Sequence, residues 1–315
     1  MRSAPRLLLL VAALIMWAVL PLFLARNLVD LLVFAGIFSI AGLGIGLLLG
    51  HCGIASLAQG MFYGLGAYAS AYCSITFGAP AIVGFVIGLA VAAAIALLVG
   101  WPVLRLTGFF LALATLCLAV IGNAIFFEWD WLTGGSLGIG GIPKIQLFGF
   151  AFDTPGKYYY LVWILAFLCM RLGYQLVTSR NGLMMQAVRD SPDAALSLGI
   201  DIQAVRTRIF VLCSMFGSLA GSLFAHYTSF ASVESFTIER SITFLLIPVI
   251  GGVSSVTGVI VGALFVIFVP ELFSKLGDFH QILFGLALVF VVIVMPGGIV
   301  GAVRQLFAAG RRKAR

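Results

Sequence analysis

The sequence predicts an all-α protein, a polytopic bundle of helices that crosses a membrane several times. Of its 315 residues, 62% are hydrophobic and only 9% are charged, whereas soluble domains carry about 25% charged residues. The mean hydropathy is +1.18. Six uncharged runs between the charges are at least 19 residues long, and one crossing takes about 20 apolar residues. These observations exclude a soluble globular domain, and residues 1–315 are predicted to form a single transmembrane domain.

The first two uncharged runs predict four crossings. Residues 7–25 form the first run, which we expect to be an uncleaved anchor because it exceeds the roughly 7–15 apolar residues of a secretory signal. Residues 31–104 form the second run, which is long enough for about three crossings. We expect its helices to break near residues 51–53, His-Cys-Gly, and near residues 78–80, Gly-Ala-Pro.

The later runs predict the remaining membrane segments. We expect the helix that starts near Lys157 to continue to Val177, with Arg171 extending its charge toward the interface. In total the sequence predicts about eight full spans and one broken or re-entrant segment, or about nine to ten membrane segments. The later uncharged runs are residues 106–127, 158–170, 209–233, 241–270 and 279–303.

The distribution of basic residues predicts which side each loop faces. Lys and Arg are enriched in the cytoplasmic loops of membrane proteins. With both termini inside, most of the eighteen basic residues lie in the cytoplasm, where a loop spans about 179–208, and an outer loop spans about 128–157. The basic residues left outside are Arg26, Lys144, Lys157, Arg240 and Lys275.

The run at 241–270 is the predicted broken segment. Both Arg208 and the C-terminal tail are assigned to the inside, which requires an even number of crossings, yet only three runs separate them. Pro248 and the pair Gly251-Gly252 interrupt the middle of this run. Non-helical backbone at membrane depth occurs where protein covers it or where it lines a cavity, so Gly251 and Gly252 are candidates for a translocation path. A helix that is only kinked at Pro248 is the alternative.

Five polar residues lie within otherwise apolar spans. Each is a candidate for lining a translocation path, and an interhelical hydrogen bond is the alternative role for each. The residues are Ser56, Gln59, Tyr63, Thr115 and Asn123.

Glycines recur at four-residue spacing in several spans. Small residues at this spacing let helix backbones approach closely, which favours helix association in a membrane. These glycines are Gly42/Gly46/Gly50, Gly60/Gly64, Gly84/Gly88 and Gly217/Gly221.

The polar stretch at 179–208 predicts two short helices. The first begins at about Leu183, and the second has Ser191 as N-cap and Pro192 at its first position. Gly199 suits the left-handed conformation that ends a helix. An apolar surface on these helices could dock into a groove on a partner or lie on lipid. That surface would comprise Met184, Met185, Val188, Ala194, Ala195 and Leu198.

The sequence lacks the motifs of several enzyme classes. It contains neither a G-x-x-x-x-G-K-[ST] phosphate loop nor an H-E-x-x-H zinc motif, so we expect no ATP hydrolysis, no metal site and no enzymatic activity. Mid-span carboxylates, typical of ion-driven carriers, are almost absent, so we expect another subunit to supply the driving force. The alternatives are a passive channel or ion-coupled carrier, and a hydrolase that uses Ser136 in a G-x-S-x-G match. The net charge of +7 indicates topology, and no nucleic-acid partner is expected.

Several segments resemble, in the same order, those of a known family. Residues 182–200, GLMMQAVRDSPDAALSLGI, are similar to the coupling loop of branched-chain amino acid ABC transporter permeases. Residues 56–68, SLAQGMFYGLGAY, resemble the family's S-L-G-Q-x-x-F-x-G-x-G-A-Y stretch. Residues 104–116 and 133–143 are similar to elements of the family's LivM-type subunit rather than its LivH-type partner.

The resemblance implies a permease subunit of an ATP-driven importer for branched-chain amino acids in a bacterial inner membrane, with alternating access as its mechanism. It implies four partners: a second homologous permease, two cytoplasmic ATP-binding subunits and an external solute-binding protein. It also implies that the partner subunits bind ATP and that this chain binds no cofactor. The family's coupling loop corresponds here to Gly182, Arg189, Asp190, Pro192, Ala195 and Gly199.

Two positions depart from the family pattern. Leu137 stands where the family commonly carries an acidic residue, and Ala58 replaces a glycine. These departures leave open a permease for urea, amides or another small polar solute, beside an ATPase-independent carrier or channel.

Overall fold

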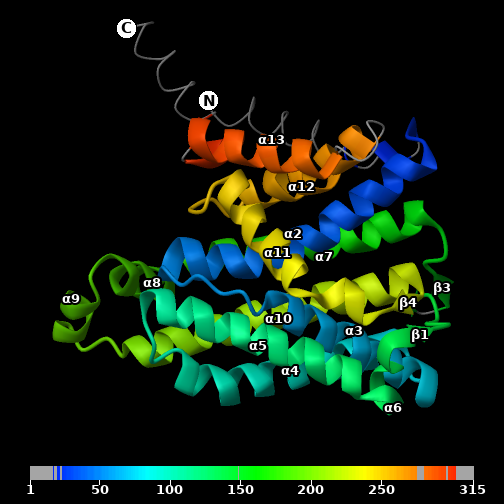
Figure 1. The fold of residues 1–315 in the computed structure, drawn as a ribbon, viewed down its shortest axis with the longest axis horizontal. Helices are drawn as coiled ribbons and strands as arrows, with labels where there is room; N and C mark the ends of the chain where they lie inside the picture. Colours follow the sequence, from blue (N-terminus) through cyan, green and yellow to red (C-terminus); the bar gives the residue numbers. More distant parts are fainter. Residues whose placement is uncertain are drawn as a thin grey trace, which may run out of the picture.

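The protein is a bundle of helices with four very short strands at one end (Figure 1). The computed structural model describes residues 17, 20–21, 23–147, 149–274, 280–295 and 297–302. The helices are α2 (Arg26–Cys52), α3 (Gln59–Thr76), α4 (Ala81–Val103), α5 (Gly108–Glu128), α6 (Asp130–Thr133), α7 (Pro155–Thr178), α8 (Arg180–Asp190), α9 (Pro192–Ser197), α10 (Ile202–Thr228), α11 (Ile238–Gly251), α12 (Gly258–Ser274) and α13 (His280–Val294). Two 3₁₀ turns, η1 (Gly135–Leu137) and η2 (Val233–Phe236), accompany them.

Helix α2 forms the centre of the bundle. It is apolar on all sides, as expected for a buried helix, and nearly all of its side chains from Val29 onward are buried. Its glycines allow close packing on several faces at once. A Cβ added at Gly36, Gly42 or Gly44 would lie within 3.0 Å of α7, α11 or α10, respectively. The small residues therefore let α2 pack closely against three neighbouring helices.

Helices α3 and α10 cross at very short distance beside α2. A Cβ at Gly66 would lie 2.0 Å from the carbonyl oxygen of Ser218, and one at Gly221 would lie 1.7 Å from that of Tyr63. Ser222 Oγ donates a hydrogen bond of 2.9 Å to the Gly66 carbonyl at the same crossing. This packing confirms the close helix approach predicted for the Gly217/Gly221 pair.

The outer helices expose large apolar side chains, as the walls of a membrane protein do. Leu98 of α4 and the pair Phe109 and Phe110 of α5 are each more than 60% exposed. Within the described residues, five helices are long and apolar enough to cross a membrane: α2, α4, α5, α7 and α10. The predicted all-α membrane bundle is thus confirmed, whereas the count of about eight spans remains a prediction. The first predicted span, residues 7–25, lies largely outside the described residues.

The predicted helix breaks coincide with those of the structure. Helix α2 ends at Cys52, residues 77–80 separate α3 from α4, and residues 252–257 separate α11 from α12. Helix α7 continues to Thr178, one residue beyond the predicted end.

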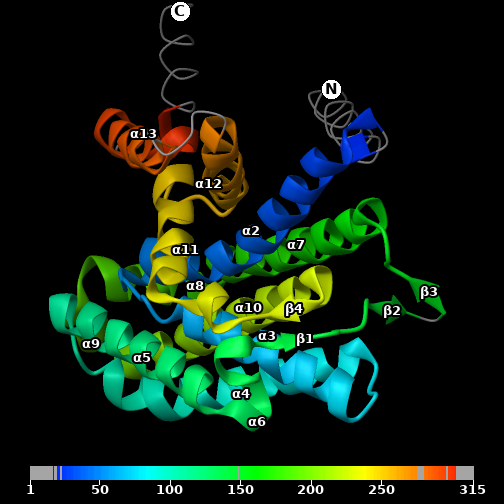
Figure 2. The same cartoon turned by 45° about the vertical axis from the view of Figure 1, so that its right-hand side comes forward.

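The strands are the part of the architecture that the sequence did not predict. β1 (Ile139–Gly140) pairs antiparallel with β4 (Phe230–Ala231), in the register Ile139↔Ala231. β2 (Gln146–Leu147) pairs antiparallel with β3 (Phe150–Ala151). The strands lie at one end of the bundle, and α8 and α9 lie at the other (Figures 1 and 2). The predicted outer loop and the predicted cytoplasmic loop are therefore at opposite ends.

Candidate functional site

The chain leaves α2 in an extended segment, residues 53–58, that turns back along the helix. Gly53 has φ +69, a left-handed conformation that ends α2. Six residues later, Gln59 Nε2 donates a hydrogen bond of 3.0 Å to the carbonyl of Ala41. Ala41 lies about 16 Å along α2 from Cys52 at 1.5 Å per residue. Helix α3 therefore begins level with the middle of α2, and a non-helical segment runs beside the last turns of α2.

Side chains and local turns satisfy the backbone of this segment. Thr115 of α5 accepts a hydrogen bond of 3.1 Å at Oγ1 from the Leu57 amide. Ser56 Oγ accepts one of 3.4 Å from the Ala58 amide. Ser56 and Thr115 are both buried. The structure thus brings these two predicted path residues together, and both hydroxyls bond to backbone.

The second break, residues 252–257, lies against the same end of α2. Gly252 has φ +120, which an L side chain rarely adopts. A Cβ at Gly50 of α2 would lie 1.9 Å from the carbonyl oxygen of Val253. The crevice between the break and α2 is too narrow to hold a water molecule. Both breaks therefore lie beside the C-terminal half of α2, and the second break packs tightly on it.

Gln59 joins three helices in the middle of the bundle. Its Nε2 donates to the carbonyls of Ala41 in α2 and Cys213 in α10, at 3.0 and 3.2 Å, and Cys213 Sγ donates to its Oε1 at 3.0 Å. The side chain is buried. From the sequence alone, two roles were open for Gln59: lining a path or forming an interhelical hydrogen bond. The structure shows the interhelical hydrogen bonds.

Tyr63 and Asn123 meet the chain at η2. The Tyr63 ring lies 5.6 Å from that of Phe236, and Asn123 Nδ2 donates a hydrogen bond of 3.4 Å to the Val233 carbonyl. The buried Tyr63 hydroxyl has no hydrogen-bond partner among the described residues. Most buried polar groups are paired, so this hydroxyl is an exception.

Arg240, which the distribution of basic residues assigns to the outer side, contacts the core helix in the structure. Its guanidinium lies 5.3 Å from the ring centroid of Phe38, near the middle of α2. Ser241, next along the chain, accepts a hydrogen bond of 2.8 Å at Oγ from the Gly60 amide, so the start of α11 lies beside the start of α3.

The predicted cytoplasmic segment forms two helices, α8 and α9, that break at Ser191. Helix α8 begins at Arg180, three residues earlier than predicted. Ser191 occupies the N-cap position and Pro192 the first helical position of α9, although the Ser191 side chain makes no capping hydrogen bond. Gly199 has φ +77, the left-handed conformation predicted for it.

Arg189 attaches α8 to the end of α2. Its Nη1 donates a hydrogen bond to the carbonyl of Gly50, and its Nε pairs with Asp190 at 2.8 Å. The last carbonyls of a helix carry the negative end of its dipole, so a guanidinium is favourable there. The methylene chain of Arg189 packs against Gly53, where a Cβ would lie 2.8 Å from its Cγ. Arg189, a predicted coupling residue, thus contacts the end of α2. Asp190, another one, pairs with Arg189 there.

The other predicted coupling residues have structural roles in the same segment. A Cβ at Gly182 would lie 1.9 Å from the Val177 carbonyl oxygen, so the turn from α7 into α8 needs glycine there. Ala195 is buried and Pro192 is exposed.

The apolar surface expected on this segment is only partly available. Met185, Val188 and Ala195 are buried against neighbouring helices, because α8 packs on the ends of α2 and α10. The large apolar side chains that do face outward are Leu183, Leu196 and Leu198, at 66%, 58% and 78% exposure.

Ser136 lacks the setting of a nucleophile elbow. It lies exposed in the 3₁₀ turn η1, between α6 and β1, and not at a strand-to-helix turn.

Comparison with known proteins gives one family and several relatives. The family model for the branched-chain amino acid transport system / permease component matches residues 27–294. The chain is 31% identical over 318 residues to the high-affinity branched-chain amino acid transport system permease protein LivM of Escherichia coli K12, covering 94% of this chain and 75% of that protein. A probable LivM of Methanocaldococcus jannaschii is 24% identical over 54% of this chain and 53% of its own length.

A more distant relative has a different substrate in its name. The ribose import permease protein RbsC of Escherichia coli K12 is 24% identical over 233 residues, covering 69% of this chain and 72% of that protein. No solved structure shows significant similarity to this chain.

Proposed function

This chain belongs to the permease family of branched-chain amino acid transport systems, and on that premise we propose that it is the membrane subunit of an ATP-driven importer of branched-chain amino acids. The hydrogen bond between Arg189 and Gly50 is the observation that supports the coupling mechanism. It attaches the proposed coupling segment, residues 180–199, to α2, which lies beside both breaks.

The proposed mechanism is alternating access driven from the cytoplasmic side. Movement of the ATP-binding partners would displace α8 and α9, and Arg189 would transmit that displacement to α2. Because the break at 252–257 packs tightly against α2, a shift of α2 would open or close the crevice between this break and α2. Broken helices at membrane depth are typical of sites where transporters bind and gate their substrates.

The proposed path runs past the polar groups beside the middle of α2. The unpartnered hydroxyl of Tyr63 and the guanidinium of Arg240 lie on either side of the Phe38–Phe244 ring pair, whose centroids are 5.1 Å apart. A branched-chain amino acid has an apolar side chain and a charged backbone. Aromatic rings suit the former, and a hydroxyl with a cation suits the carboxylate of the latter.

The proposed assembly follows from the family to which the chain belongs. We propose a second homologous permease, two cytoplasmic ATP-binding subunits that hold the ATP, and an external solute-binding protein. The proposed location is a bacterial inner membrane with both termini in the cytoplasm. In that orientation α8 and α9 face the ATP-binding partners.

Transport by the reconstituted complex tests this proposal. The chain is purified in mild detergent with the subunits that accompany it, incorporated into proteoliposomes, and assayed for uptake of radiolabelled leucine with and without ATP. We expect a co-purifying protein with a phosphate-binding loop and leucine uptake that requires ATP. Uptake by the chain alone would identify a channel or ion-coupled carrier. Uptake of urea or acetamide in place of leucine would identify the alternative substrate class.

A further inference from the structure

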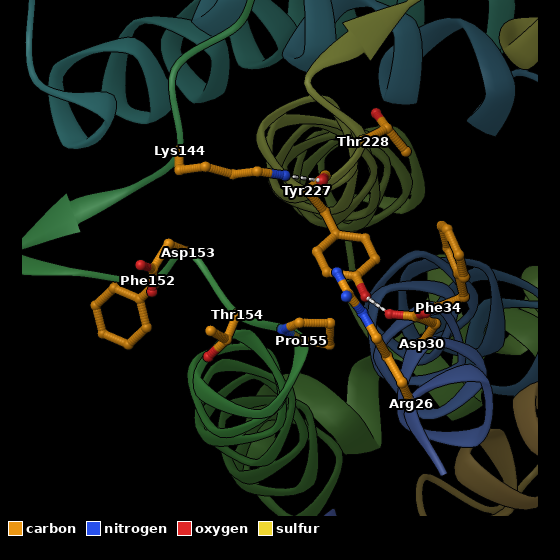
Figure 3. Close-up of a pocket in the computed structure, with 10 residues that line it drawn as sticks. All are labelled: Arg26, Asp30, Phe34, Lys144, Phe152, Asp153, Thr154, Pro155, Tyr227 and Thr228. Carbon is orange, nitrogen blue, oxygen red and sulfur yellow. Dashed lines mark hydrogen bonds between the residues drawn. The ribbon is translucent and has the colours of Figure 1, made fainter.

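A pocket of about 420 Å³ opens at the end of the bundle opposite to α8 and α9 (Figure 3). It lies where α2 and α7 begin and α10 ends, and the segment around Lys144 covers it. Its volume falls within the roughly 300–1,000 Å³ of small-molecule sites. Nothing in the proposed transport path uses this pocket.

The wall of the pocket is held in place by several contacts. The Tyr227 ring packs between Phe34 and Tyr158, with centroids 5.5 and 4.8 Å away. His226 Nδ1 lies 2.7 Å from the Pro143 carbonyl oxygen, and Lys144 Nζ donates to the Tyr227 carbonyl. These contacts fix the Lys144 segment against α10, so the site is preorganised.

The charges that line the pocket are kept apart. Arg26 and Asp30 are one helical turn apart on α2, a spacing at which opposite charges commonly pair, yet the described residues form no ion pair between them. Asp30 Oδ1 instead accepts a hydrogen bond from the Tyr227 hydroxyl. The Arg26 guanidinium has no hydrogen-bond partner among the described residues, and Figure 3 shows it beside the Tyr227 ring at the pocket. The remaining acid, Asp153, is already paired with Lys157 at 2.8 Å.

Arg26 also stands at a position that disfavours a cation. It is the first residue of α2, and the N-terminal end of a helix carries the positive end of the dipole. Helix α7 likewise begins at the pocket, with Pro155 as its first residue. Two helix N-termini and a free guanidinium together attract a carboxylate.

We propose that this pocket binds the zwitterionic head group of a free α-amino acid, its carboxylate on Arg26 and its ammonium group on Asp30. The aromatic rings of Phe34, Phe152 and Tyr227 form an apolar wall for a branched aliphatic side chain. The inference rests on the proposed function for the choice of substrate, and it adds an entry site at the outer end of this subunit. A concave pocket with opposite, separated charges suits a small zwitterion better than the surface of a protein.

Direct binding to the full-length chain in nanodiscs tests the inference, since every lining residue belongs to this chain. Binding of radiolabelled leucine is measured by scintillation proximity, in competition with 4-methylpentanoic acid, which lacks the amino group, and 3-methylbutylamine, which lacks the carboxylate. We expect each analogue to bind at least tenfold more weakly than leucine. Arg26→Gln and Asp30→Asn should each weaken leucine binding at least tenfold, whereas Arg26→Lys should retain most of it.

The controls separate the pocket from general effects on the protein. The amide oxygen that Asp30→Asn introduces could still accept the Tyr227 hydrogen bond, so this variant preserves the local structure. Glu128→Gln, an exposed acid at the end of α5, should bind leucine like the unchanged protein. Leucine binding that both pocket variants leave intact would overturn the inference. The inference would also be overturned if the pocket variants bound leucine normally and lost only the stimulation of uptake by an external binding protein. The pocket would then serve protein docking.

The outcome can be distinguished from failure of the proposed function. If the complex imports leucine but the pocket variants bind it normally, the function stands and the pocket inference is wrong. If the complex imports no branched-chain amino acid, the proposed function fails independently of the binding result.

Discussion

Arg189 of α8 donates a hydrogen bond from its guanidinium to the backbone carbonyl of Gly50, in the last turn of α2. These residues lie 139 positions apart in the chain, and their contact joins the most polar segment of the protein to its most buried helix. The contact adds a charged hydrogen bond to the packing of α8 on the end of α2.

Replacing Arg189 with glutamate should uncouple the transporter without removing it from the membrane. Hydrogen bonds to charged groups contribute about 1.5–3 kcal/mol, and a carboxylate would repel the Gly50 carbonyl. We expect leucine uptake to fall roughly ten- to a hundredfold at an unchanged amount of membrane protein. The matched control is Glu128→Arg, a charge reversal at an exposed residue at the end of α5, outside the coupling segment. Normal uptake in the Arg189 variant would show that this contact transmits nothing.

Gly199 should be sensitive to backbone conformation and insensitive to side-chain size. Its φ is +77, yet a Cβ there would meet no atom within 4 Å. Proline, which fixes φ near −65°, cannot adopt this conformation, so Gly199→Pro should abolish coupled uptake. Gly199→Asn should be tolerated, because asparagine enters the left-handed region at low cost. The measurement is ATP-dependent leucine uptake by both variants. Equal loss of uptake in both would mean that position 199 tolerates no side chain at all.

Gly221→Ala should destabilise the bundle strongly. The new Cβ would lie 1.7 Å from the Tyr63 carbonyl oxygen, a backbone atom that can move only if α3 and α10 separate. We expect a clearly lower unfolding temperature in detergent and reduced yield. Gly285→Ala in α13 is the matched control, since no atom lies within 4 Å of its Cβ and alanine favours a helix by roughly 0.5–1 kcal/mol. If both variants unfold at the same temperature, the α3–α10 crossing does not limit stability.

The sequence predicted the ends of the helices better than their packing against one another. Charges and small or helix-breaking residues mark the ends at Cys52, Thr76 and Gly251, because each feature acts locally. The extended segment at 53–58 carries no such mark. Its path depends on Gln59 reaching Ala41 and Cys213, contacts between residues 18 and 154 positions apart.

The site was predicted unevenly for the same reason. Arg189, Asp190 and Gly199 could be chosen because their segment resembles a known motif and obeys helix-capping rules. The contact of Arg240 with Phe38 could not be predicted, because it joins residues far apart in the chain. The pocket at Arg26 and Asp30 could not be predicted from the sequence. Its lining also includes Lys144 and Tyr227, which are far from α2 in the chain.

Gln59→Leu should affect stability more than substrate choice. Gln59 bonds to two carbonyls on different helices, and removing a partner from a buried polar group costs about 1–3 kcal/mol. We expect a lower unfolding temperature while the relative uptake of leucine, isoleucine and valine stays the same. A changed order of preference at an unchanged unfolding temperature would place Gln59 on the translocation path instead.

The central claim is that α8 and α9 form the cytoplasmic contact through which ATP-driven motion reaches α2. Its most direct test is the sidedness of Ser191→Cys, compared with Leu137→Cys at the opposite end, in a background whose five native cysteines are replaced by alanine. A membrane-impermeant maleimide should label Ser191→Cys only in inside-out vesicles and Leu137→Cys only in intact cells. Labelling of Ser191→Cys in sealed intact cells would contradict the account.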